Sequence, residues 1–275
     1  MLGLSIAFGI LVFLLSITAL VICIKNRYET AATLKHGVLL AAVVIGLDLL
    51  AIPLVPDALA DMDTAVIAVL AIGSILRFIA ITLLTCLGIH CARSLGYQDV
   101  PLLRRLLARE EGDGGVVSKG YLLSSIGLAL GAVAFTAILF VAIPPQLSST
   151  FVDVSEIDMA EYGIAEFITP ALILVVIQAT IYEEILFRLC IQSFVAKYLG
   201  LNGRKYVWAV LLTAGLWAIL HLGALDPVWI KFVQVFPIGI ALGFLFRKYG
   251  LGSAILAHGA FNVAGMFLAV HLVNW

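Results

Sequence analysis

Several side chains that ionise or form strong hydrogen bonds lie inside stretches of sequence that are otherwise apolar. A charged side chain at the centre of a lipid bilayer costs about 2.5–3.5 kcal/mol on insertion scales, so such residues are candidates for function. The second half of the chain holds the densest group of them: Glu183, Glu184, Arg188, His221, His258 and Asn262. Carboxylates and imidazoles are the usual general acids and bases of enzymes, so this set predicts acid–base chemistry within the membrane.

The two adjacent carboxylates are predicted to have different roles. One face of a helix through this segment carries a polar residue at every fourth position: Thr180, Glu184, Arg188 and Gln192. Glu184 precedes Arg188 in the favourable order for an ion pair, which we interpret as structural support. Glu183 projects about 100° away from that face, and a carboxylate without a fixed cation suits a general base. The alternative is that the whole cluster is an ion-pair network that only joins helices.

The histidines and the asparagine follow the same helical spacing. His221 lies four residues after Trp217, and Asn262 lies four residues after His258. Residues four apart share one face of a helix. Counted at about 1.5 Å per residue from the ends of their segments, these side chains reach the same layer of the membrane as Glu183. The sequence therefore predicts that Glu183, His221, His258 and Asn262 line one cavity.

The elements that must position these residues are membrane-spanning helices. The chain is 63% hydrophobic and only 12% charged, and its mean hydropathy is +1.15, whereas soluble domains carry about 25% charged residues. A helix needs about 20 apolar residues to cross the hydrocarbon core. The sequence predicts an all-α polytopic membrane protein of about eight transmembrane helices. The predicted spans are Leu2–Ile24, Gly37–Val55, Ala65–Cys91, Tyr121–Ile143, Ile168–Val195, Val207–Leu222, Trp229–Phe246 and Leu251–Val273. The sixth of these is short and is expected to end inside the protein.

The distribution of charge predicts an orientation. Most of the 16 basic residues fall in alternate loops, around 25–36, 92–120, 196–206 and 247–248, while the opposite loops are acidic. By the positive-inside rule these basic loops are cytoplasmic, which places both termini on the non-cytoplasmic side.

The chain is expected to divide into three regions. These are an N-terminal three-helix transmembrane region at 1–95, a cytoplasmic amphipathic segment and linker at 96–120, and a catalytic transmembrane core at 121–275. Within the middle region, Leu102–Leu107 is predicted to form a short helix, and Gly112–Gly115 reads as a flexible linker.

Ionisable residues also occur in the first three predicted spans. Asp48 and Arg77 lie in neighbouring spans, and an unpaired charge there would be costly, so we expect them to pair. The alternative is that Arg77 faces the catalytic cavity.

The remaining composition excludes some functions. A net charge of −1 gives no basic surface for nucleic acid. The four cysteines are Cys23, Cys86, Cys91 and Cys190. They form no metal-binding spacing or disulfide framework, and we interpret them as small buried hydrophobic residues.

Three motifs in order resemble those of the CPBP family, which comprises CAAX prenyl proteases and bacteriocin-processing or bacteriocin-immunity (Abi-type) membrane proteins. They are Glu183-Glu184-x-x-x-Arg188, Trp217-x-x-x-His221 and His258-x-x-x-Asn262. The similarity covers roughly 168–268, and the first three spans carry none of it. The family more commonly has Phe where this chain has Trp217, a change expected to alter packing more than chemistry.

The resemblance implies an intramembrane endopeptidase of the glutamate type. It implies that Glu183 and His221 activate a water and that His258 and Asn262 stabilise the oxyanion. Glu184, Arg188 and Trp217 would support them. The family has also been described as metalloproteases, in which case Glu183, His221 and His258 would be the ligands of a Zn²⁺ ion. No H-E-x-x-H motif is present, and a site without metal or other cofactor is favoured.

Two other functions remain open at the level of sequence. One is a non-catalytic membrane scaffold or bacteriocin-immunity protein that binds a membrane partner. The other is a secondary transporter with Asp48, Arg77 and Glu183 on an ion path, although such transporters usually show internal repeats, and none is found. The expected partners are the lipid bilayer and a membrane-associated protein or peptide substrate. The Ala-, Leu-, Val- and Gly-rich composition suggests a prokaryotic cell membrane.

Overall fold

The computed structural model describes residues 2–54, 63–103, 118–148 and 169–273 of the chain. Helices make up nearly all of the described residues. They are α1 (Leu2–Lys25), α2 (Arg27–Ala51), η1 (Ile52–Leu54), α3 (Thr64–Ser94), α5 (Lys119–Ala142), α8 (Pro170–Glu184), η2 (Ile185–Gln192), α9 (Ser193–Tyr198), η3 (Gly203–Lys205), α10 (Tyr206–Leu220), α11 (Trp229–Tyr249) and α12 (Leu251–Leu272). The predicted all-α polytopic membrane fold is confirmed.

Seven helices in the described part of the chain are long and apolar enough to cross a membrane, which makes this an integral membrane protein. Seven of the eight predicted spans correspond to such helices in the described residues. The exception is α10, which has 15 residues. At about 1.5 Å per residue it covers roughly 22 Å, less than the hydrocarbon thickness of about 30 Å. It is the segment expected to end inside the protein, and the placement of the termini relative to the membrane stays a prediction.

Capping side chains fix where several of these helices begin. Asp63 accepts a hydrogen bond from the backbone of Ala65 at the start of α3, and Ser118 accepts one from Tyr121 at the start of α5. Thr169 does the same for α8, whose first residue is Pro170. Such caps satisfy backbone N–H groups that have no partner within the helix.

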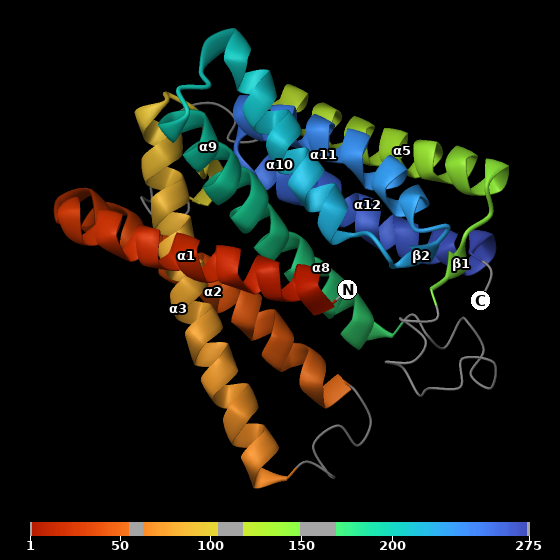
Figure 1. The fold of residues 1–275 in the computed structure, drawn as a ribbon, viewed down its shortest axis with the longest axis horizontal. Coiled ribbons are helices and arrows are strands. Elements are labelled where there is room, and N and C mark those ends of the chain that lie inside the picture. Colours follow the sequence, from red (N-terminus) through yellow and green to blue (C-terminus); the bar gives the residue numbers. More distant parts are fainter. Residues whose placement is uncertain (1, 55–62, 104–117, 149–168, 274–275) are drawn as a thin grey trace.

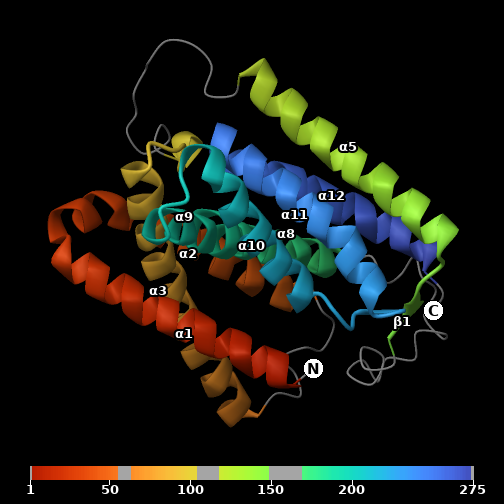
Figure 2. The ribbon, with the colours of Figure 1, turned by 45° about the horizontal axis from the view of Figure 1, so that its top comes forward.

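The continuous helix formed by α8, η2 and α9 runs through the middle of the molecule (Figure 1). Helices α2 and α3 pack on one side of it, and α10, α11 and α12 pack on the other, with α5 along the outer edge of α11 and α12 (Figure 2). Helix α3 approaches η2 very closely. A Cβ atom placed on Gly88 would lie 2.6 Å from the carbonyl oxygen of Leu189, so only glycine fits there.

The predicted division into three regions is not tested by these features and stays a prediction. One hydrophobic core nevertheless takes buried residues from both predicted transmembrane regions, including Leu15, Ile81, Leu186 and Phe246. The predicted helix Leu102–Leu107 lies only partly within the described residues, and the predicted linker Gly112–Gly115 lies outside them.

A two-stranded antiparallel sheet ties the turn between α10 and α11 to the end of α5. Strand β1 (Gln146–Leu147) pairs with β2 (Leu225–Asp226). The backbone N–H of Ser148 extends the contact by donating to the carbonyl of Ala224 at 3.4 Å. This sheet therefore restrains the loop that follows His221, the residue that directly follows α10.

Candidate active site

The predicted polar stripe on the central helix is buried in the protein interior. The exposed fractions are 1% for Thr180, 0% for Glu184 and Arg188, and 1% for Gln192. Immediately after Glu184 in the sequence, the helix widens into a π-helical segment, η2. Such segments are rare and often occur at functional sites, because the wider turn changes the direction of the side chains.

Trp217 lies at the centre of the predicted catalytic residues. Its Nε1–H donates a hydrogen bond to Glu183 Oε2 at 2.7 Å. The centre of its indole ring lies 4.9 Å from that of His221 and 5.2 Å from that of His258, both edge-on. A phenylalanine has no N–H and could not make this hydrogen bond, and the expectation that the tryptophan affects packing more than chemistry stays untested.

The orientation of His221 follows from its hydrogen bond. Its Nδ1 lies 2.8 Å from the backbone carbonyl oxygen of Trp217, one turn earlier. A carbonyl oxygen only accepts, so Nδ1 carries the proton and donates it. In a neutral imidazole the other nitrogen, Nε2, then has the lone pair that can take a proton.

Glu184 has two partners instead of the one predicted. Its Oε2 lies 3.4 Å from Nε of Arg188, which is the predicted ion pair, and its Oε1 accepts a hydrogen bond from Nδ1 of His258 at 2.8 Å. The contact with His258 joins α8 to α12, and helical spacing within one segment could not predict it. Burial of this carboxylate is tolerable because two cationic or hydrogen-bonding groups surround it.

The guanidinium group of Arg188 is held by charge and by an aromatic face. Its Cζ lies 4.9 Å from the centre of the Trp217 ring, and none of its nitrogens has a hydrogen-bond partner among the described residues. A guanidinium over an indole is the strongest common cation–π arrangement. Trp217 therefore contacts the supporting ion pair as well as the predicted base.

Asn262 contacts the polar face of α8 at Thr180. Its Nδ2 donates a hydrogen bond to Oγ1 of Thr180 at 2.9 Å, and that hydroxyl in turn donates to the carbonyl of Val176 at 2.8 Å. An asparagine amide carries two N–H groups. The contact with Thr180 uses one of them and orients the amide.

Lys231 is a charged residue near this site that the sequence did not identify. It lies in the first turn of α11 and interacts electrostatically with Glu183 and His221. In the sequence it only marks the edge of a span. Nothing in the spacing within α11 relates it to the motifs on α8 and α10.

The predicted pair of Asp48 and Arg77 is confirmed. The distance from Nη1 of Arg77 to Oδ2 of Asp48 is 2.6 Å. The guanidinium also lies over the ring of Tyr182, 5.2 Å from its centre. Arg77 thus touches the residue immediately before Glu183 but pairs with Asp48.

The metal-ligand alternative concerns Glu183, His221 and His258. No group of three or more His, Cys, Asp or Glu side chains within the described residues is placed to hold a metal ion. The nitrogen Nδ1 of His258 is directed at Glu184, and Nδ1 of His221 is directed at a backbone carbonyl. These hydrogen bonds leave Nε2 of both rings available, so the alternative of a Zn²⁺ held by Glu183, His221 and His258 stays a prediction.

A known protein family matches the part of the chain that contains these residues. Residues 165–264 match the family described as type II CAAX prenyl endopeptidase Rce1-like. This segment is similar to an Rce1-like domain. It contains every motif residue from Glu183 to Asn262, so the resemblance read from the sequence is confirmed.

A curated relative of the Rce1-like domain is the sporulation-killing factor biosynthesis protein SkfC of Bacillus subtilis (strain 168). It is 31% identical over 88 residues, which make up 32% of this chain and 17% of the relative. The match therefore spans about a sixth of the length of that protein. No solved structure matches the chain significantly.

Proposed function

We propose that this protein is an intramembrane endopeptidase that hydrolyses a peptide bond of a membrane-associated protein or peptide. The support comes from the family match and from the arrangement of the side chains. The Rce1-like domain is of a peptidase family, and the side chains that such chemistry needs surround one tryptophan in the second half of the chain.

The observation that carries the proposal is the state of Glu183. Its carboxylate is half-buried, and Oε2 is fixed by the indole N–H of Trp217 at 2.7 Å. Within the described part of the chain, Oε1 has no hydrogen-bond partner and belongs to no ion pair. A carboxylate with one oxygen anchored and one available is suited to take a proton from water, unlike Glu184, whose two oxygens both face partners.

In the proposed reaction, Glu183 accepts a proton from a water molecule while the oxygen of that water forms a bond to the peptide carbonyl carbon. His221 orients the same water through Nε2. The carbonyl oxygen becomes an oxyanion, which is stabilised by the second N–H of Asn262 and by Nε2–H of His258 in its cationic form, whose Nδ1–H donates to Glu184. Glu183 then transfers its proton to the leaving amine as the C–N bond breaks, which restores the carboxylate.

The proposed chemistry uses no metal ion. Glu183 supplies the base, and the oxyanion donors are side-chain N–H groups, so each proton and charge has a place without a Lewis acid. We propose that the substrate lies in or on the bilayer, since the groups concerned occur on membrane-spanning helices and on α10 between them. The identity of the peptide and any prenyl group on it are separate questions of specificity.

The test compares Glu183→Gln with wild type in cell membranes and with purified protein. The amide keeps the size of the side chain but cannot accept a proton from water. We expect uncleaved precursors to accumulate in the membrane proteome of cells with Glu183→Gln, at unchanged protein level. The matched control is Asp63→Asn, which removes an exposed carboxylate remote from the site and keeps a helix-capping residue. Cleavage by Glu183→Gln at a rate near wild type would exclude this residue as the base, and unchanged cellular function would favour the scaffold or immunity role.

A further inference from the structure

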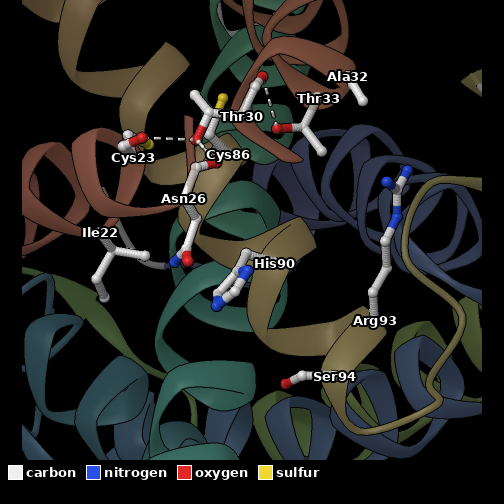
Figure 3. Close-up of a pocket in the computed structure, with 10 residues that line it drawn as sticks. All are labelled: Ile22, Cys23, Asn26, Thr30, Ala32, Thr33, Cys86, His90, Arg93 and Ser94. Carbon is white, nitrogen blue, oxygen red and sulfur yellow. Dashed lines mark hydrogen bonds between the residues drawn. The ribbon is translucent and has the colours of Figure 1, made fainter. Parts of the chain in front are cut away.

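A second polar region lies where α1, α2 and α3 meet, away from the candidate active site. It surrounds a cavity of about 340 Å³. The lining residues are Ile22, Cys23, Asn26, Thr30, Ala32, Thr33, Cys86, His90, Arg93 and Ser94. Its rim includes the exposed residues Asn26, Arg93 and Ser94, on the side that the basic loops predict to be cytoplasmic. In Figure 3, Cys23, Thr30 and Cys86 gather on one side of the cavity, apart from Arg93 and Ser94.

The two cysteines in this cavity lie near each other. Cys23 comes from α1 and Cys86 from α3, their side chains line the same cavity, and each affects the electrostatics of the other (Figure 3). A hydroxyl from α2 accompanies each thiol, Thr30 beside Cys23 and Thr33 beside Cys86. Their exposed fractions are 8% and 2%, so the cavity provides the approach to both sulfur atoms.

We propose that Cys23 and Cys86 form a reversible disulfide site that is oxidised by peroxide entering this cavity. In the first step one thiol, as its thiolate, attacks the peroxide oxygen, which breaks the O–O bond and gives a sulfenic acid and water. The second thiol then displaces that hydroxyl, forming the S–S bond and releasing a second water. Two thiols lose two electrons and two protons, and one hydrogen peroxide is reduced to two waters.

The disulfide would add a covalent link between α1 and α3, which already pack against each other. Near its other end, α1 stacks Phe8 on Phe187 of η2, with ring centres 6.2 Å apart. Helix α3 contacts η2 through Gly88. The bond therefore ties α1 to the helix that supports the π-helical segment, without touching Glu183 or Trp217. Oxidation is expected to stabilise the protein and to leave the catalytic groups in place.

The experiment treats the full-length protein in detergent or liposomes with hydrogen peroxide. The remaining thiols are then counted by maleimide labelling after denaturation, and linked peptides are identified by mass spectrometry without reduction. We expect two of the four thiols to disappear together, one peptide pair joined through Cys23 and Cys86, and full recovery after dithiothreitol. The midpoint of thermal unfolding should rise for the oxidised protein and return on reduction.

The other two cysteines provide the controls. Cys91 and Cys190 have exposed fractions of 0% and do not line the cavity. The Cys91→Ser variant should still lose two thiols. The Cys23→Ser variant should form no disulfide, and its only oxidation product should be a sulfenic acid on Cys86, which a dimedone probe captures. Three results would overturn the proposal. One is a disulfide between Cys91 and Cys190, and another is disulfides that join separate molecules only. The third is the absence of any disulfide at peroxide concentrations that oxidise Cys86 in Cys23→Ser.

Discussion

The replacement of Trp217 by phenylalanine separates the chemical role of this residue from its bulk. The substitution keeps an aromatic ring between His221 and His258 but removes the N–H that donates to Glu183 at 2.7 Å. A hydrogen bond to a charged group contributes about 1.5–3 kcal/mol. If that bond holds the base in its productive orientation, its loss raises the barrier by the same amount, which corresponds to a decrease of roughly 10- to 150-fold in kcat.

The assay is the steady-state cleavage of a membrane peptide by purified protein, with kcat and KM measured separately. An orienting bond to the base should affect kcat and leave KM nearly unchanged, since it does not contact the bound peptide. Trp208→Phe is the matched control on the same helix, because that side chain is 58% exposed on the outer surface of α10. Equal kcat for Trp217→Phe and Trp208→Phe would refute the orienting role and return Trp217 to packing.

Three further predictions concern the support of the site. Arg188→Ala leaves the carboxylate of Glu184 buried with His258 as its remaining partner, and we expect a loss of about 3–5 kcal/mol in stability, seen as poor expression or an early thermal transition that Glu183→Gln does not show. Gly88→Ala places a methyl group 2.6 Å from a backbone oxygen of η2, so it should lower the free energy of unfolding by about 1–3 kcal/mol. Its control is Gly127→Ala, where a Cβ meets nothing within 4 Å and the thermal midpoint should not fall. Wild-type activity should survive dialysis against a strong chelator, and a loss that Zn²⁺ restores would exclude the metal-free reaction.

Much of the fold followed from the sequence because apolar length and charge are local properties. The ends of the predicted third span, Ala65–Cys91, differ from those of α3 by one residue at the start and three at the end. The ends of the helix α10 were predicted with similar accuracy. It is not counted among the spans because it is too short, although its sequence is apolar. Asp48 and Arg77 could be paired because lipid leaves two neighbouring opposite charges few other partners.

Several other contacts between side chains on different helices could not be predicted from the sequence. Helical spacing predicted which face of α8 is polar, yet it could not say that Glu184 meets His258 on α12. Lys231 was missed for a related reason, since its closeness to Glu183 depends on how α11 packs against α10. Cys23 on α1 and Cys86 on α3 lie near each other, and each cysteine alone resembles any small buried residue.

The position of Trp217 explains why adjacent carboxylates differ in chemistry. Glu184 is surrounded by Arg188 and His258, so its charge is balanced and both oxygens are engaged. Glu183 lies on the other side of the same turn, where one indole N–H holds one oxygen. The same indole ring lies 4.9 Å from Cζ of Arg188, so Trp217 contacts the cation that pairs with Glu184 as well as the carboxylate of Glu183. In the proposed reaction, a single aromatic residue on the short helix α10 would thereby contact both the structural ion pair and the reactive carboxylate.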